Sequence, residues 1–161
     1  MENLSPAFFE KKKVLMNCVD LEVAVSLIYK EFMLMFPAEA DFWGQLAREE
    51  EDHARLYLAG DILKVIGEFT GIQFPPSAFI EKTIEFTQQI REQIASRPIT
   101  LKEALDMALK LEKTIMESII FDLPDSDNTV IRNLKKIFTD TESHVDRIER
   151  FRIEKGFAFL D

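Results

Sequence analysis

Apolar residues recur every three to four positions over most of the chain, in segments separated by short stretches rich in proline, glycine and aspartate. This spacing is typical of amphipathic α-helices whose apolar sides face a shared core. Thr100 with Glu103 predicts a capping box, and Ser77 predicts the N-cap of a shorter helix. We therefore expect an all-α fold with four long helices and a shorter one, at residues 6–36, 40–69, 100–121, 129–155 and 78–95.

The lengths of the connections predict how these helices are arranged. Residues 37–41 and 122–128 are short connections, so the helices on either side of each must run antiparallel. Residues 70–99, which include the short helix, form one long crossover between the two helix pairs. Two antiparallel pairs joined in this way form a ferritin-like four-helix bundle. We expect residues 1–161 to be a single domain of this kind.

Three glutamates lie at the centres of otherwise apolar helix faces. Cys18, Ser26 and Tyr29 flank Glu22, while Glu50 and Glu112 have similar surroundings on their own helices. A buried carboxylate is costly unless it is paired, hydrogen-bonded or coordinated. No lysine or arginine occupies the middle of a predicted core face, so ion pairs explain these acids less well than a bound cation does.

The two histidines occupy matching places in an internal repeat. His53 follows Glu22 by 31 residues, and His144 follows Glu112 by 32. Glu50 and His53 form an E-x-x-H pair, which places both side chains on one helix face about one turn apart. Two such halves packed together predict a carboxylate-bridged centre for two metal ions.

The second half of the repeat has Thr141 where the first half has a glutamate. The neighbouring acids Asp140 and Glu142 each lie about 100° away from the centre of the predicted core face. We therefore expect the half-site of His144 to be incomplete. Tyr29 and Tyr57 each follow an inward glutamate by seven residues, so they are either core residues or groups that hydrogen-bond a ligand carboxylate or relay a radical.

Composition narrows the possible partners. The net charge of −9 and the pI near 4.8 disfavour nucleic acid, because a phosphate backbone would be repelled. Cys18 is the single cysteine, so no internal disulfide and no C-x-x-C metal site can form. No apolar run reaches the length of a membrane span, and the N-terminus lacks the layout of a signal peptide. These features predict a cytoplasmic protein with no membrane partner.

The segments AREEEDHARLY and ALDMALKLEKTI, with the E-x-x-H pair, resemble the di-iron domain of the rubrerythrin group in the ferritin-like superfamily. The resemblance covers nearly the whole chain. It implies that Glu22, Glu50 and His53 serve one metal, that Glu112 and His144 serve a second, and that Glu50 bridges the two. The fourth-helix acid of the family would stand at position 141. A rubredoxin-like domain is not encoded, so electrons would come from a separate donor protein.

Three functions fit these observations. The resemblance favours an oxidoreductase that binds iron, with manganese or zinc as other possible metals, and that reduces peroxide or oxidises Fe(II). A non-catalytic protein that holds or senses metal through one good site is the first alternative. A structural bundle that oligomerises through its helix faces is the second, but it leaves the three buried glutamates unexplained. We expect a homo-oligomer, most simply a dimer.

Overall fold

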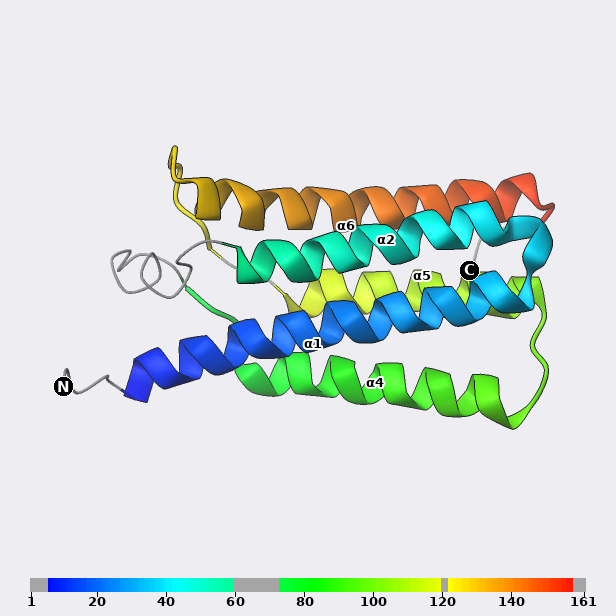
Figure 1. The fold of residues 1–161 in the computed structure, drawn as a ribbon, viewed down its shortest axis with the longest axis horizontal. Helices are drawn as coiled ribbons and strands as arrows, with labels where there is room; N and C mark the ends of the chain where they lie inside the picture. The colour runs from blue at the N-terminus through cyan, green and yellow to red at the C-terminus, as the bar shows by residue number, and fades with distance from the viewer. Residues whose placement is uncertain (1–5, 60–72, 120–121, 158–161) are drawn as a thin grey trace.

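The computed structural model describes residues 6–59, 73–119 and 122–157. Within these residues the chain forms five α-helices and no β-strand, so the predicted all-α fold is confirmed. All five helices run along the long axis of the molecule (Figure 1). The elements are α1 (Pro6–Met35), the short 3₁₀-helix η1 (Pro37–Glu39), α2 (Ala40–Leu58), α4 (Ser77–Ser96), α5 (Leu101–Ser118) and α6 (Thr129–Glu154).

The helices form two antiparallel pairs with a fifth helix beside them. Helix α1 packs against α2, and α5 packs against α6. Helix α4 lies along α1 and also contacts α5 (Figure 1). Because α4 carries the chain back along the length of the bundle, α2 and α5 run in the same direction. This arrangement places the middles of α1, α2, α5 and α6 around a common interior.

The end of α2 differs from the sequence prediction. The helix ends at Leu58, and Ala59 has the extended backbone angles φ −74° and ψ 133°. The predicted helix over 40–69 is therefore interrupted at Ala59, and the prediction of one continuous helix is wrong at this residue. The next residue in the sequence is Gly60, and glycine commonly follows the last residue of a helix. Residues 60–69 lie outside the described residues.

Local capping accounts for the starts of the later helices. The Thr100 hydroxyl accepts a hydrogen bond from the Glu103 amide at 3.2 Å, and the Glu103 carboxylate accepts one from the Thr100 amide at 2.8 Å. The predicted capping box is confirmed. Ser77, in contrast, is the first residue of α4 rather than its cap, and the preceding Pro76 makes no side-chain capping bond. Asn128 caps α6 through a 2.8 Å bond from the Val130 amide.

Aromatic side chains pack together where α1 meets α2. The Trp43 ring lies 4.9 Å from the Phe32 ring and is stacked on the Tyr29 ring at 5.8 Å, measured between centroids. Next to it, Gly44 lets α1 approach closely, since a Cβ atom there would lie 3.2 Å from Sδ of Met33. This packing fixes α1 relative to α2, the two helices that supply three of the candidate ligands.

An ion pair between the buried Arg152 and Asp106, whose side chain is 24 % exposed, joins α5 to α6 away from the centre of the bundle. The Arg152 side chain is 4 % exposed, and its Nε donates to Oδ1 of Asp106 at 2.7 Å. Lys102 contacts the other carboxylate oxygen at 2.7 Å, but its side chain is 49 % exposed. Removing one partner of a buried pair leaves an uncompensated charge.

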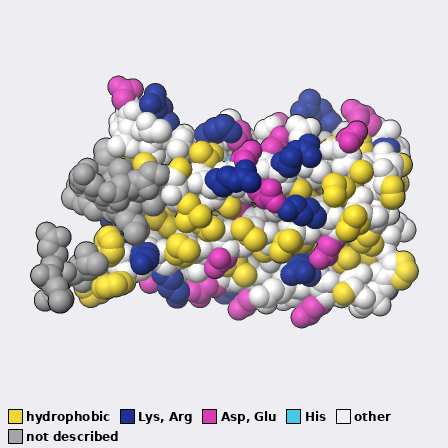
Figure 2. All heavy atoms as spheres, viewed as in Figure 1, with side chains coloured by type: hydrophobic (Ala, Val, Ile, Leu, Met, Phe, Trp, Pro, Cys, Tyr) yellow, Lys and Arg dark blue, Asp and Glu magenta, His cyan; other side chains and the backbone are white. Residues whose placement is uncertain are grey.

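The surface combines charged side chains with a row of apolar ones along α1 (Figure 2). This row, here called the α1 stripe, consists of exposed apolar residues: Phe9, Met16, Val23, Leu27 and Leu34. None of the helices in the described part of the chain is both long and apolar enough to cross a membrane.

The Asp106–Arg152 pair gives a stability prediction. Asp106→Ala should lower the free energy of unfolding by about 3 kcal/mol, because the buried guanidinium loses its counter-charge. Lys102→Ala should cost less than about 1 kcal/mol, as exposed pairs contribute little. The double variant Asp106→Ala/Arg152→Leu should recover most of the loss. Denaturant unfolding measures all three, and equal losses for Asp106→Ala and Lys102→Ala would contradict the assignment.

Candidate metal centre

The five candidate ligands from the sequence meet in the interior of the bundle. Glu22 comes from α1, Glu50 and His53 from α2, Glu112 from α5 and His144 from α6. Each is at most 2 % exposed. Helical periodicity places each of them on the inward face of its helix, as the apolar neighbours predicted. Within the described residues they form two groups of three, with one possible ligand atom per residue and all such atoms of a group within 4.8 Å of one another.

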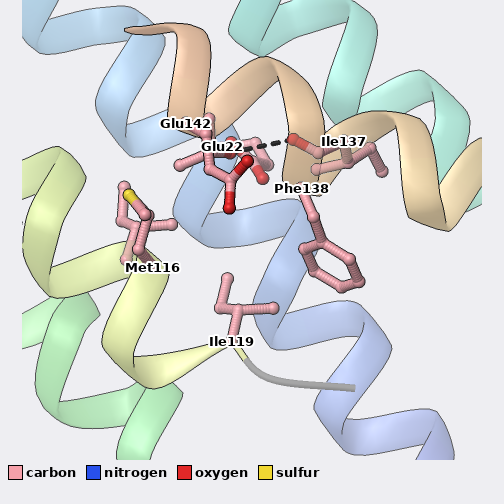
Figure 3. Close-up of a pocket in the computed structure, with 8 residues that line it drawn as sticks. Glu22, Met116, Ile119, Ile137, Phe138 and Glu142 are labelled. Carbon is pink, nitrogen blue, oxygen red and sulfur yellow. Dashed lines mark hydrogen bonds between the residues drawn. The ribbon is translucent and has the colours of Figure 1, made fainter. Parts of the chain in front are cut away.

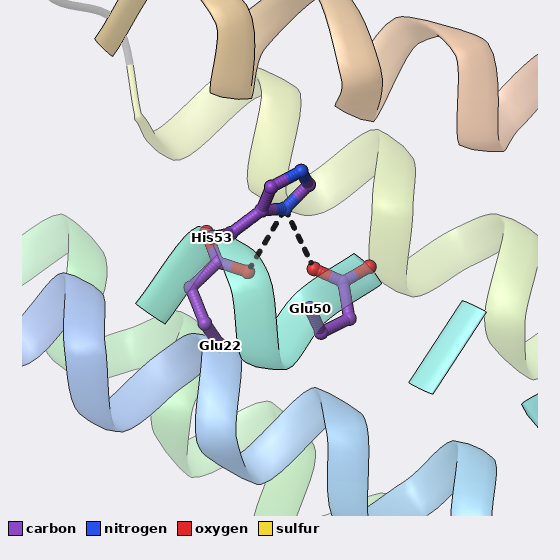
Figure 4. A group of neighbouring side chains, drawn as sticks. All are labelled: Glu22, Glu50 and His53. Carbon is purple, nitrogen blue, oxygen red and sulfur yellow. Dashed lines mark hydrogen bonds and ion pairs between the residues drawn. The ribbon is translucent and has the colours of Figure 1, made fainter. Parts of the chain in front are cut away.

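The first group consists of Glu22, Glu50 and His53 (Figure 4). Nδ1 of His53 lies 3.1 Å from Oε2 of Glu50 and 3.8 Å from Oε2 of Glu22. Figure 4 shows both carboxylates pointing toward the same imidazole nitrogen. The group therefore offers two oxygens and one nitrogen around a single point.

The second group consists of Glu50, Glu112 and His144. Nδ1 of His144 lies 2.9 Å from Oε1 of Glu50 and 3.5 Å from Oε1 of Glu112. Glu50 thus presents one oxygen to each histidine. The two imidazole rings are stacked, with centroids 5.4 Å apart. A carboxylate shared in this way between two nitrogen–oxygen groups has the form of a bridging ligand.

Two further acids hold the outer nitrogens of the imidazoles in a crosswise pattern. Nε2 of His53 on α2 lies 3.3 Å from Asp140 on α6, and Nε2 of His144 on α6 lies 2.9 Å from Glu49 on α2. Asp140 is in turn paired with Lys136, and Glu49 with Arg147. A carboxylate on the distal nitrogen fixes the orientation of an imidazole and makes it a stronger metal ligand.

Sequence reasoning missed Glu49 and Asp140 because both lie outside the centres of the core faces. It gave Glu49 no role in the site and considered Asp140 only as an acid next to Thr141. In the structure Asp140 reaches His53 instead. A usable signal was present in the sequence, since each acid precedes a histidine by four residues, but the partner of each is the histidine of the opposite helix.

The two tyrosines differ in their relation to the centre. The Tyr29 hydroxyl donates a hydrogen bond to Oε1 of Glu112, so it contacts a candidate ligand directly. The Tyr57 hydroxyl is buried and has no hydrogen-bond partner among the described residues. Burial, with the nearby Cys18 and Glu22, raises the pKa of Tyr57 well above its ordinary value. Tyr29 is therefore the tyrosine with a defined contact to the site.

Thr141 contributes no ligand atom to either group. It is 5 % exposed, and its hydroxyl donates to the carbonyl of Ile137 at 3.0 Å. Each group nevertheless has two carboxylates and one imidazole, so the two are equal in number of ligands. The missing acid at position 141 does not concern the His144 group alone, because Thr141 lines a cavity together with Glu22 of the first group.

The burial of so many ionisable groups shifts their proton affinities. Burial alone would lower the pKa of His53, but Glu22 and Glu50 raise it to about 10. In the same way Glu112, Glu49 and Glu50 overcome the burial of His144 and raise its pKa to about 12. Without metal, both imidazoles are therefore cationic at neutral pH and supply the charge that balances the acids.

The pKa values of the three buried glutamates shift in different directions. Burial acts to raise the pKa of Glu50, but the two imidazoles overcome it and hold the pKa well below its ordinary range. Burial, with the charge of Glu50, raises the pKa of Glu22 well above its ordinary value. The same two causes raise the pKa of Glu112. Glu50 is thus the carboxylate that stays ionised, and its negative charge makes ionisation of Glu22 and Glu112 less favourable.

The polar atoms that lack partners indicate that this cluster suits a cation. Oε1 of Glu22 is buried and has no hydrogen-bond partner among the described residues. Oε1 of Glu50 and Nδ1 of His144 are also buried, and they lie 2.9 Å apart without the geometry of a hydrogen bond. Unsatisfied buried polar atoms are rare, and a metal ion would satisfy all three. Carboxylate oxygens with imidazole nitrogens form the ligand set of iron, manganese and zinc sites. The residues present therefore fit such an ion.

Comparisons of this chain with protein-family models, with curated proteins and with solved structures find no match. Its function must be inferred from its own residues and their geometry.

The pKa shifts predict how pH affects the metal-free protein. A group with a raised folded-state pKa stabilises the fold fully below its unfolded pKa, and this contribution is lost as the pH rises toward the folded value. For His53 that window runs from 6.5 to about 10. In chelator, the melting temperature should therefore fall between pH 7 and pH 9, and it should fall less in His53→Gln.

Metal-loaded protein should show a smaller loss over the same window, because coordinated imidazoles are already deprotonated. Thermal melts followed by circular dichroism would test both statements. Equal slopes for the natural chain and His53→Gln in chelator would contradict the charge assignment.

Proposed function

We propose that this protein is a ferritin-like metalloprotein of the rubrerythrin type that binds two first-row metal ions, iron foremost. The observation that carries the proposal is Glu50, whose two oxygens face two different histidines in a fully buried setting. Glu22 and His53 would complete one metal position, and Glu112 and His144 the other. Manganese and zinc suit the same ligands, but only iron and manganese cycle between oxidation states there.

The proposed activity is oxidoreduction, with peroxide reduction or Fe(II) oxidation as the reaction. Bound iron would supply the redox change between its ferrous and ferric states. The chain's own residues would orient the ligands and exclude water. Asp140 and Glu49 hold the imidazoles, and the Tyr29 hydroxyl donates to Glu112. Since residues 1–161 contain no C-x-x-C site, electrons would come from a donor outside this domain.

Thr141 favours a second candidate function, non-catalytic metal holding or sensing. With no acid at this position, Glu50 is the single carboxylate shared by the two groups. One bridge constrains two metals less than two bridges do, so the second ion could bind weakly. A purely structural role explains the buried acids poorly, because replacing them with apolar residues would stabilise the bundle more.

Metal content tests the binding proposal. Protein purified without added metal should contain first-row metal by elemental analysis. Glu50→Ala should lower metal per chain at least twofold, because Glu50 belongs to both groups. The control Glu85→Ala changes an exposed acid on α4 and should retain the natural content.

Chelation should lower the melting temperature of the natural protein, since a ligand that binds only the folded state stabilises it. A chelated protein that melts at the same temperature as the untreated protein would count against a bound metal.

The rate of Fe(II) oxidation by peroxide distinguishes the proposed enzyme from a non-catalytic metal-binding protein. Protein loaded anaerobically with Fe(II) should oxidise it within seconds of mixing with peroxide, as followed by absorbance in a stopped-flow instrument. His144→Gln should slow this at least tenfold, because it removes the nitrogen ligand of the second group. A rate equal to that of free Fe(II) with peroxide would favour the metal holder.

Thr141→Glu tests the meaning of the missing acid. The new carboxylate would be buried beside Glu22, so in chelator it should lower the free energy of unfolding by about 2 kcal/mol or more. Fe(II) or Mn(II) should restore stability, and metal per chain should be at least that of the natural protein.

Thr139→Glu places the same charge on the exposed side of α6 and serves as the control, with an expected change within about 0.5 kcal/mol. Failure of metal to rescue Thr141→Glu would show that position 141 does not face the metal positions.

A further inference from the structure

A cavity of about 170 Å³ lies beside the first ligand group, between α1, α5 and α6 (Figure 3). Its floor includes Glu22 and Thr141, which are buried, and two of its lining residues, Met116 and Glu142, are exposed. The cavity therefore extends from the candidate metal centre toward the surface. Its remaining walls are apolar: Ile115, Ile119, Ile137 and Phe138.

The size and lining of the cavity suit a small organic molecule. Engineered apolar cavities of about 150 Å³ in another protein stay dry and bind benzene. Apolar walls with a few convergent polar groups are also the usual form of a ligand site. Here the buried polar atom available to a ligand is Oε1 of Glu22, which has no hydrogen-bond partner among the described residues. The Thr141 hydroxyl is already committed to the Ile137 carbonyl.

The charges around the cavity select a neutral ligand. Glu22 stands at its inner end, and Glu142 is among the exposed residues of its lining (Figure 3). None of the described residues that line it is a lysine, arginine or histidine. In the metal-free protein a carboxylate or phosphate ligand would bring its charge into this apolar setting with no compensating cation among the lining residues, which is unfavourable. A molecule with an O–H group can instead hydrogen-bond to Glu22 and place its apolar body against the isoleucines.

We propose that this cavity is the substrate pocket of the metal centre and that it takes a neutral molecule up to about benzene size bearing one hydroxyl or hydroperoxyl group. The O–H end lies against Glu22, beside the first metal position, and the apolar body points toward Met116. This inference rests on the proposed function for the identity of the centre. It narrows the peroxide substrate to a small organic hydroperoxide and makes the corresponding alcohol a product-like ligand.

The test uses the metal-free full chain, so that binding is measured apart from redox activity. Phenol, toluene and benzoate are the probes, and phenol and toluene contain the same number of non-hydrogen atoms. Calorimetry should give a dissociation constant for phenol of about 1 mM or below. Toluene should bind at least about fivefold more weakly, because it leaves Glu22 without a partner. Benzoate should show no binding.

Two substitutions that fill the cavity, and one control substitution in a different cavity, test where phenol binds. Met116→Trp and Ile119→Phe should each abolish phenol binding, and the partly exposed Met116 tolerates the larger side chain if Ile119→Phe fails to fold. Ile94→Phe is the control, since Ile94 lines a different cavity between α1 and α4. Phenol binding that survives both filling variants, or toluene binding as tight as phenol, would overturn the inference. Phenol binding in a protein that never takes up metal would retain the pocket and reject the proposed function.

The α1 stripe carries a second and independent inference. Its five residues fall within about 40° of one another around the helix axis. From Phe9 to Leu34 it extends about 37 Å along α1. Five exposed apolar side chains aligned on one face of a helix over this length are typical of an interaction surface.

We infer that a second copy of this chain covers the α1 stripe, with its own α1 antiparallel to the first. In one antiparallel register, Phe9 faces Leu34 of the other copy and Met16 faces Leu27. The same register brings Lys12 opposite Glu31, which also contacts Arg91 of its own copy, so opposite charges meet at both ends of the contact. It also brings Lys13 opposite Lys30, but each of these lysines pairs with an acid of its own copy, Glu81 and Glu51. Val23 then lies within half a turn of the two-fold axis.

Sedimentation equilibrium and cross-linking test this register. The natural protein should sediment as a dimer at micromolar concentration, and Leu27→Glu should make it monomeric. Ile153→Glu, an exposed apolar residue on α6, is the control and should remain dimeric. The double variant Met16→Cys/Leu27→Cys should cross-link between copies on oxidation, whereas neither single cysteine should. Position 16 lies about 16 Å along the helix from its own symmetry mate. A monomeric natural protein, or cross-linking by either single variant, would overturn the inference.

Discussion

The interaction on which the site depends is the contact of one buried carboxylate, Glu50, with two imidazoles. Glu50 is 2 % exposed, and ionising a carboxylate there is costly unless positive charge lies nearby. His53 and His144 provide that charge at 3.1 and 2.9 Å when they are protonated. Two metal ions would provide more of it and would also satisfy Oε1 of Glu22, which has no hydrogen-bond partner among the described residues. Protons and metal therefore compete for the same atoms, which couples metal binding to pH and to folding.

The topology of the bundle brings these groups together at one place in its interior. Glu22, Glu50, Glu112 and His144 come from four helices, and each lies near the middle of its helix. Helix α4 returns the chain along the bundle, so that α5 and α6 can close the side of the site left open by α1 and α2. The crosswise contacts of Asp140 with His53 and of Glu49 with His144 then tie α2 to α6. Asp140 and Glu49 thus hold α2 and α6 together and also orient the two imidazoles.

Much of this could be predicted from the sequence, for physical reasons that also explain the failures. Helical periodicity identifies Glu22, Glu50 and Glu112, because burying an acid at the centre of an apolar face is costly unless it is paired, hydrogen-bonded or coordinated. Short loops and the capping box at Thr100 fix most helix boundaries. Periodicity does not reveal the end of α2, because backbone angles at Ala59 depend on local sequence and packing. Glu49 and Asp140 were missed because they act across the interface between helices, and a single helix face does not show its partner.

Thr141 links the two unusual features of the centre. A glutamate at this position would project from α6 toward Glu22 and occupy part of the space that is now the cavity. The threonine hydroxyl turns back to the Ile137 carbonyl instead, so it neither fills that space nor offers a charge. The absent acid and the apolar cavity therefore have a common cause in one side chain. If the metal centre is as proposed, the coordination position that a second bridging carboxylate would have filled is left for a substrate that reaches it through the cavity.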